Sequence, residues 1–240
     1  MVANDMARQQ AFRFKTWGGK RRGAGRPRRG KRAGEPHKKR PPLAHGNPVH
    51  VTIRAARDLG SLRKSDTYAA IRAATLTAAR QHADFHIVHI SIQATHVHLI
   101  VEASDRVALA RGMQGFEISA ARHVNRAITK RLGMRRTGPV FPDRYHPRIL
   151  NSPRSVRHAI AYVLNNWRHH GAHVHAFARR WRIDPFSSAI GFDGWKSLAP
   201  SAPPPSYKAM WTWLPRTWLL STGWRRHGLI RADEIPGLRC

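Results

Sequence analysis

The chain has 240 residues, which suits one domain with appendages or two small domains. Its 43 Lys and Arg residues against 13 Asp and Glu residues give a formal charge of +30, which indicates a polyanionic partner. Nucleic acid is the partner that we expect, and an anionic membrane surface is the second possibility. The sequence has no run of about 18 apolar residues to span a membrane, and no apolar segment near its start predicts a secretory signal. The single cysteine, Cys240, excludes an intrachain disulfide and fits a reducing, cytoplasmic, nucleoid-associated setting.

Residues 1–46 read as a basic, largely disordered tail rich in glycine and proline. Between residues 8 and 40 there are fourteen Lys or Arg residues and a single acid, Glu35. One interpretation is a solubilising tail; the one we favour is an arm that lies along DNA phosphates without reading sequence. The residues expected to make those contacts are Lys20, Arg21, Arg22, Arg26, Arg28 and Arg29.

The pattern changes after this tail. Residues 49–54 (VHVTIR) alternate apolar and polar side chains, which predicts a strand with one buried face. Residues 67–82 are rich in alanine with apolar residues at helical spacing, and Asp66 is suited to cap a helix there. Residues 85–93 alternate again, and we expect Val88 to share a face with the isoleucines that follow it.

A third strand follows at once, at residues 95–103 (THVHLIVEA), so a hairpin is expected. His96 and His98 are two residues apart and therefore lie on one face of that strand, while Val97 points to the other. Such a pair is either two metal ligands or two polar residues on a solvated face. A short motif of this kind does not decide between the two.

Two helices are predicted in the second half of the chain. Residues 105–132 have apolar residues every three or four positions, and Gly133 is placed to end that helix. An extended segment or short strand pair is expected at residues 138–150. Ser152 then caps a helix over 153–169, where proline at the first position is tolerated.

The resulting order of elements, β-α-β-β-α-β-α, predicts an α+β fold of the ferredoxin-like sandwich type. We expect a small antiparallel sheet with helices on one face and the histidines on the open face. Around it we expect a basic tail at residues 1–46, one compact domain at 47–170, and a Trp- and Arg-rich extension at 171–240.

The last helix offers partners for the histidine pair. Tyr162 and Asn166 are four residues apart and share a helix face, and His158 lies one turn earlier on that face. A phenolate beside a metal-bound phosphate can attack phosphorus and form a covalent ester. An amide oxygen such as that of Asn166, with imidazoles, suits Mg²⁺ or Mn²⁺, and His158 is the rival third ligand. Tyr145 is a rival nucleophile, which we expect to be a packing residue.

Three further arginines are candidates for nucleic-acid contact. Arg144 precedes Tyr145 in a segment where an exposed side chain would meet DNA, and Arg225 and Arg226 in GWRRHG suit backbone phosphates. The sequence has no Gly-x-x-x-x-Gly-Lys loop, so we expect no nucleotide cofactor.

Several of these motifs together resemble one family. His96-Val97-His98 matches the HUH pattern of single-strand DNA nucleases, and Tyr162 with Asn166 looks like the tyrosine helix of single-tyrosine transposases. The flanking stretches TWGGKRRGAGRP (16–27), HKKRP (37–41), PVHVTIR and DPFSSA (184–189) resemble REP-associated tyrosine transposases. The resemblance covers roughly residues 16–190. The chain departs from it at residues 93–95 (QAT), where the family often has Met-Pro-Asn.

The resemblance implies an enzyme that recognises a DNA hairpin, cuts an adjacent single strand and rejoins strands through a 5′-phosphotyrosine intermediate. It assigns His96, His98 and Asn166 as ligands of Mg²⁺ or Mn²⁺, and Tyr162 as the nucleophile. The expected partner is single-stranded DNA with hairpin structure, and the sequence does not choose between a monomer and a homodimer. Two other functions stay open: a domesticated DNA-binding protein that does not cut, and a metal-dependent nuclease that uses water.

Overall fold

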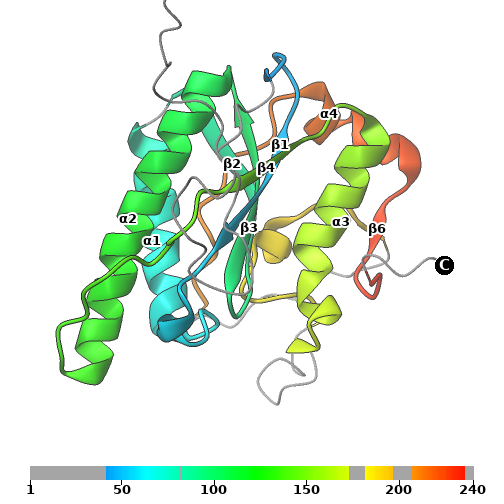
Figure 1. The fold of residues 1–240 in the computed structure, drawn as a ribbon. Coiled ribbons are helices and arrows are strands. Elements are labelled where there is room, and N and C mark those ends of the chain that lie inside the picture. Colours follow the sequence, from blue (N-terminus) through cyan, green and yellow to red (C-terminus); the bar gives the residue numbers. More distant parts are fainter. Residues whose placement is uncertain (1–41, 82, 173–181, 197–206, 236–240) are drawn as a thin grey trace, which may run out of the picture. The chain divides into compact units, whose positions relative to one another are not determined.

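The computed structural model describes residues 42–81, 83–172, 182–196 and 207–235. Four strands form an antiparallel sheet in the order β2-β3-β1-β4. They are β1 (Val49–Arg54), β2 (Phe85–Ile92), β3 (His96–Ala103) and β4 (His146–Ile149). Three long helices accompany them: α1 (Ser65–Gln81), α2 (Arg106–Leu132) and α3 (Pro153–His169), with a short 3-10 turn η1 (Arg57–Leu59) after β1. This element order and strand order confirm the predicted α+β fold of the ferredoxin-like type (Figure 1).

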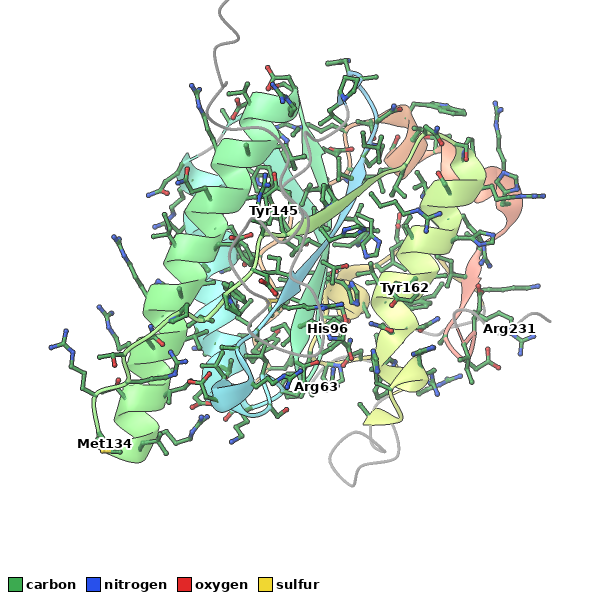
Figure 2. All side chains as sticks on the ribbon, viewed as in Figure 1. Arg63, His96, Met134, Tyr145, Tyr162 and Arg231 are labelled. Carbon is green, nitrogen blue, oxygen red and sulfur yellow. The ribbon has the colours of Figure 1, made fainter. Side chains whose placement is uncertain are left out.

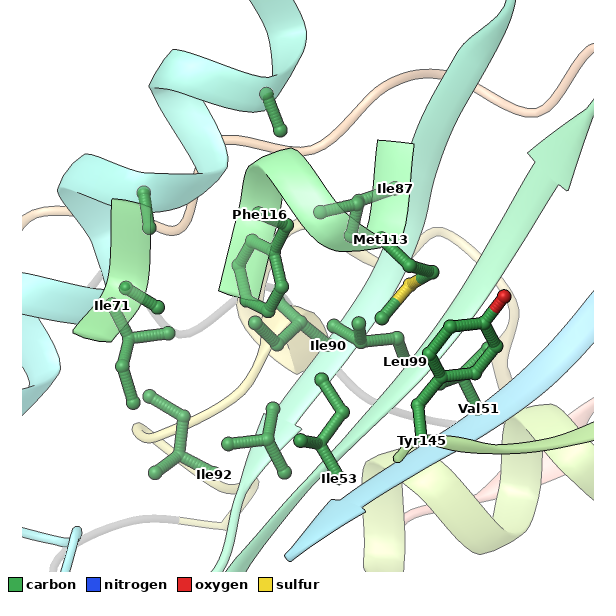
Figure 3. Packing of buried hydrophobic residues seen from close by; sticks show 14 of the residues in the cluster. Val51, Ile53, Ile71, Ile87, Ile90, Ile92, Leu99, Met113, Phe116 and Tyr145 are labelled. Carbon is green, nitrogen blue, oxygen red and sulfur yellow. The ribbon is translucent and has the colours of Figure 1, made fainter. Parts of the chain in front are cut away.

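One face of the sheet packs against α1 and α2. Alternation along the strands turns Val51, Ile90 and Leu99 toward the helices, where they meet Ile71 of α1 and Phe116 of α2 (Figure 3). All five side chains are completely buried. This layer is therefore a closed apolar core.

A glycine allows α2 to approach this face closely. A Cβ atom placed on Gly112 would lie 2.1 Å from the ring of Phe85, which is inside any real contact distance. Gly112 is therefore required by the packing of α2 on β2.

The helix ends follow the sequence signals with one exception. Asp105 caps α2 by accepting hydrogen bonds from the backbone N–H groups of Val107 and Ala108 at 2.7 and 2.8 Å, and Gly133 ends that helix with a φ of 70°. Ser152 caps α3 as predicted. Asp66 is not the cap of α1, since that helix begins at Ser65; its carboxylate accepts hydrogen bonds from the Thr67 N–H group at 2.8 Å and from Arg131 of α2 at 2.7 Å.

The other face of the sheet is covered in part by α3 (Figure 1). The expectation that the helices lie on one face holds for α1 and α2, whereas α3 lies opposite them. Its apolar residues Ile160 and Leu164 join a second buried cluster with Val88 and Ile100 of the sheet. The face that carries the histidines is therefore partly covered by α3, so that His98 is buried while His50 and His96 are half-buried.

The prediction for Val88 is wrong because β2 contains a bulge. Ile87 pairs with Val101 but His89 pairs with Ile100, which leaves Val88 as an extra residue in β2. Val88 consequently faces α3 and not α1 and α2. It thereby supplies, with Ile100, an apolar contact for α3 among otherwise polar positions.

The described parts of the C-terminal extension pack against the same sheet. They contain η4 (Ser188–Gly191), β5 (Trp195–Lys196), α4 (Trp218–Ser221), η5 (Gly223–His227) and β6 (Ile230–Arg231). Leu220, Trp224 and Ile230 are buried in the cluster under α3. The buried carboxylate of Glu102 on β3 accepts hydrogen bonds from the backbone N–H groups of Arg216 and Thr217. Within the described segments, no helix has the length and apolar character needed to cross a membrane.

Candidate active site on the histidine face

His96 and His98 lie side by side on β3 and face α3, with ring centroids 4.6 Å apart. On the neighbouring strand β1, Thr52 stands directly opposite His98 in the ladder. His50, two residues earlier, brings its ring to 5.2 Å from that of His98. Three imidazoles from two strands thus gather on this face.

Tyr162 of α3 packs against this cluster. Its ring centroid is 5.1 Å from that of His98 and 5.7 Å from that of His50. Figure 2 shows Tyr162 and His96 on the same side of the sheet, between α3 and β3. The structure therefore brings the predicted nucleophile to the predicted ligand pair.

Asn166 lies on the same stripe of α3, between two residues that contact the histidines. Tyr162 is one turn before it and meets His98, while His170 is one turn after it and lies 5.3 Å from the His96 ring. Asn166 is completely buried, and neither its amide oxygen nor its amide nitrogen has a hydrogen-bond partner. A buried amide without partners costs about 1–3 kcal/mol, and its free oxygen fits the role of metal ligand that the sequence resemblance implies for Asn166.

The donor set fits the expected metal. The Nε2 atom of His98 is also buried without a partner, so one imidazole nitrogen and one amide oxygen are both unpaired on this face. Imidazole nitrogen and amide oxygen together suit Mn²⁺ or Mg²⁺. In the part of the chain that the structure describes, no group of three His, Cys, Asp or Glu side chains is placed to hold a metal. A site here therefore depends on the Asn166 amide.

Burial sets the protonation of the cluster. It is the main cause that lowers the pKa of His98 to about 2, and the pKa values of His50 and His96 to about 4 each. These rings are consequently neutral at neutral pH and each carries one lone pair. Burial also raises the pKa of the Tyr162 phenol, which therefore stays protonated at neutral pH.

Cationic residues surround the cluster on its solvent side. Arg148 of β4 stands opposite His50, and Arg54 of β1 stands opposite His96, and both arginines are exposed. Arg148 contributes to the low pKa of His50, and Arg54 to that of His96, which shows that their charges reach the site. This arrangement suits an anionic substrate such as a phosphodiester.

The sequence analysis did not predict that His50, Thr52 and His170 lie against the histidine pair. The alternation of β1 placed His50 and Thr52 on the polar face, but only the pairing register of β1 with β3 brings them to His98. His170 lay at helical spacing from Asn166, and this spacing was the one signal available for it.

The DPFSSA stretch (184–189) forms hydrogen bonds with the end of β2. The carboxylate of Asp184, which is completely buried, forms a bidentate ion pair with Arg63 at 2.7 and 3.0 Å. Phe186 accepts a hydrogen bond from Ile92 N–H at 2.9 Å, and Ser188 accepts one from Ile90 N–H at 3.1 Å. This motif therefore supports the strand that flanks the histidines.

The remaining predicted residues lie elsewhere. His158 is exposed and lies one turn from Tyr162 on the side away from Asn166. Tyr145 is buried in the opposite core, near Val51 and Leu99, as expected for a packing residue (Figure 3). Arg144, just before it, is exposed.

The two C-terminal arginines have partners within the chain. Arg225 forms an ion pair with Asp193 at 2.8 Å and lies over the Trp224 ring. Arg226 lies over the ring of Trp218, 4.8 Å from its centroid. The predicted contacts of the basic tail, from Lys20 to Arg29, fall outside the described residues.

Comparison with known proteins gives similarity to solved structures and to nothing else that was compared. No family model matches the chain, and no curated protein does. A solved structure of a REP-associated tyrosine transposase bound to a REP hairpin is similar, with a TM-score of 0.45 and 18% sequence identity. The match covers 64% of this chain and 82% of that one. The family expected from the sequence motifs stays a prediction.

Proposed function

We propose that this chain is a metal-dependent DNA strand transferase that cuts and rejoins single-stranded DNA near hairpins through Tyr162. The observation that carries the proposal is the juxtaposition of Tyr162 with His98, next to the unpaired and buried amide of Asn166. A histidine pair, an amide and a tyrosine are the groups needed to activate a phosphodiester and to attack it. The formal charge of +30 and the exposed arginines beside the site suit DNA as the substrate.

The reaction is a transesterification. The Tyr162 Oη atom attacks phosphorus, the bond from phosphorus to the 3′ oxygen breaks, and a 5′-phosphotyrosine ester forms. The phenolic proton passes to solvent, and the departing 3′ oxygen takes up a proton to give a 3′-OH. Because burial raises the pKa of Tyr162, its proton leaves during the attack and not before it. Attack of another 3′-OH on the ester rejoins the strands.

The expected cofactor is Mg²⁺ or Mn²⁺. His96, His98 and Asn166 would hold it, and when bound it would neutralise charge on the phosphate oxygens. His98 and Asn166 present one unpaired buried atom each for that purpose, the Nε2 lone pair and the amide oxygen. Arg54 and Arg148 would hold the flanking phosphates.

The test uses single-stranded oligonucleotides taken from the DNA that flanks this gene, hairpin included, with Mg²⁺ or Mn²⁺. Denaturing gels separate free DNA fragments from DNA linked to protein. We expect a metal-dependent covalent adduct that Tyr162→Phe abolishes and that Tyr145→Phe, the control in the opposite core, retains. Cleavage without an adduct would indicate a nuclease that uses water. Binding without cleavage in either metal would indicate a DNA-binding protein.

A further inference from the structure

We propose that Thr52 and His50 are positioning residues that hold His98 in the tautomer protonated at Nδ1, which keeps the Nε2 lone pair for the metal. This inference rests on the proposed function, because it assigns a task to the two β1 residues behind a predicted metal ligand. Both residues lie in the PVHVTIR stretch, but the resemblance assigned neither of them a role in the site.

The contacts come from the pairing of β1 with β3. Thr52 is the cross-strand partner of His98, and its Oγ1 atom lies 3.1 Å from His98 Nδ1. His50 Nε2 lies 3.2 Å from the same nitrogen. The other ring nitrogen, Nε2, is buried and has no hydrogen-bond partner. All hydrogen bonding of this imidazole is therefore on its β1 side.

These contacts favour one of the two neutral tautomers. A proton on Nδ1 can be donated to the Thr52 hydroxyl or to the lone pair of His50 Nε2. A proton on Nε2 would leave a buried N–H group without an acceptor, which is rarer in proteins than a buried acceptor without a donor. The Nδ1–H tautomer therefore satisfies the ring in the absence of metal and presents a lone pair at Nε2.

Both positioning residues are themselves well fixed. Thr52 is β-branched and lies in the middle of β1, between β3 and β4, so its side chain has few alternatives. His50 touches His98 on one side and the Tyr162 ring on the other, at 5.2 and 5.7 Å between ring centroids. The same β1 residue therefore links the orientation of the ligand to that of the nucleophile.

The first measurement is the tautomer of His98 in the metal-free, full-length protein. Long-range ¹H–¹⁵N correlation spectra of protein labelled at histidine distinguish the two tautomers, and the signal lost in His98→Ala assigns the ring. We expect the Nδ1–H tautomer in the natural protein, a shift toward Nε2–H in Thr52→Val, and restoration in Thr52→Ser. Thr77→Val, which removes a hydroxyl bonded to Ala73 O in α1, serves as the matched control.

The second measurement is the affinity for Mn²⁺ alone, followed by electron paramagnetic resonance. We expect Thr52→Val to weaken Mn²⁺ binding by about 10-fold or more, and Thr52→Ser and Thr77→Val to leave it unchanged. If Thr52→Val does not fold, His50→Gln provides the same test, with a smaller expected effect because Thr52 remains.

The two proposals fail in different ways. An Nε2–H tautomer in the natural protein overturns the inference, and so does a Thr52→Val variant with unchanged tautomer and unchanged Mn²⁺ affinity. In either case the metal site still stands if His98→Ala abolishes Mn²⁺ binding. Unchanged Mn²⁺ binding in His98→Ala would overturn the proposed metal site and, with it, the role given to Thr52 and His50.

Discussion

The two faces of the sheet are made by the same strands and both carry a buried apolar cluster, but the face toward α3 also carries the histidines. On the face toward α1 and α2, Val51 and Leu99 are completely buried and their neighbours in the cluster are apolar. On the face toward α3, His98 and Asn166 are buried as well, yet they keep polar atoms without partners. Successive side chains of a strand point to opposite sides, so the residues of the main core and those of the candidate site lie on different faces of the sheet.

The difference also has an energetic meaning. Burial of apolar groups stabilises the fold by roughly 25 cal/mol per Å² of apolar surface, whereas burial of an unpaired polar group destabilises it. The α1/α2 face therefore stabilises the sheet that holds the α3 face in place. Four measurements test whether the two faces are independent in this way, and they follow in order of expected effect.

The largest change in the free energy of unfolding is expected on the face toward α1 and α2. Leu99→Ala removes a completely buried side chain next to His98 and leaves a cavity, so the free energy of unfolding should fall by about 2–5 kcal/mol. Urea titration followed by circular dichroism measures this loss. The folded fraction should form the DNA adduct at the rate of the natural protein. Loss of the adduct in fully folded Leu99→Ala protein would show that the faces are coupled.

On the α3 face we expect a substitution that raises the free energy of unfolding. Asn166→Leu removes two unpaired buried atoms, so in the presence of a chelator it should stabilise the protein by about 1–3 kcal/mol. The comparison is Thr75→Val on α1, where a buried hydroxyl donates to Arg72 O at 2.8 Å and its loss should cost about 1 kcal/mol. Added Mn²⁺ should stabilise the natural protein and not Asn166→Leu. A destabilised Asn166→Leu variant in chelator would mean that the amide has a partner.

The α3 face should also make stability depend on pH. Burial lowers the pKa of His89, which packs near Phe192, to about 4, against 6.5 in the unfolded chain. Between pH 6.5 and 4 the unfolded state takes up a proton that the folded state does not, so stability falls as the pH falls. The slope is at most about 1.4 kcal/mol per pH unit for this residue. Unfolding free energies at pH 7, 6 and 5 should decline less steeply in His89→Leu, and equal slopes in the two proteins would contradict this assignment.

The smallest effect concerns DNA affinity. Arg148→Ala removes an exposed charge beside His50, so it should weaken single-strand binding a few-fold and lower the salt slope of log K by about 1. Arg126→Ala removes an exposed arginine from α2, on the opposite side of the sheet, and should leave both quantities unchanged. Equal losses in the two variants would mean that DNA binding follows total charge and not the α3 face. Fluorescence anisotropy at several salt concentrations distinguishes these results.

Local sequence patterns were enough to predict the main helices and strands and the residue pairs within them. Period-two alternation predicted the strands and placed His96 and His98 on one face, because that property depends only on strand geometry. The four-residue spacing of Tyr162 and Asn166 likewise fixed their common stripe on α3. The capping residues Ser152 and Gly133 were also predicted correctly, since capping is a local interaction.

How these pairs meet depends on long-range packing. The bulge at Val88 and the placement of α3 opposite α1 and α2 depend on packing between segments far apart in the chain. The contact of Thr52 with His98 depends on the register between β1 and β3. Asn166 is buried without hydrogen-bond partners only in the folded chain. Such interactions join residues separated by dozens of positions, so no local pattern in the sequence encodes them.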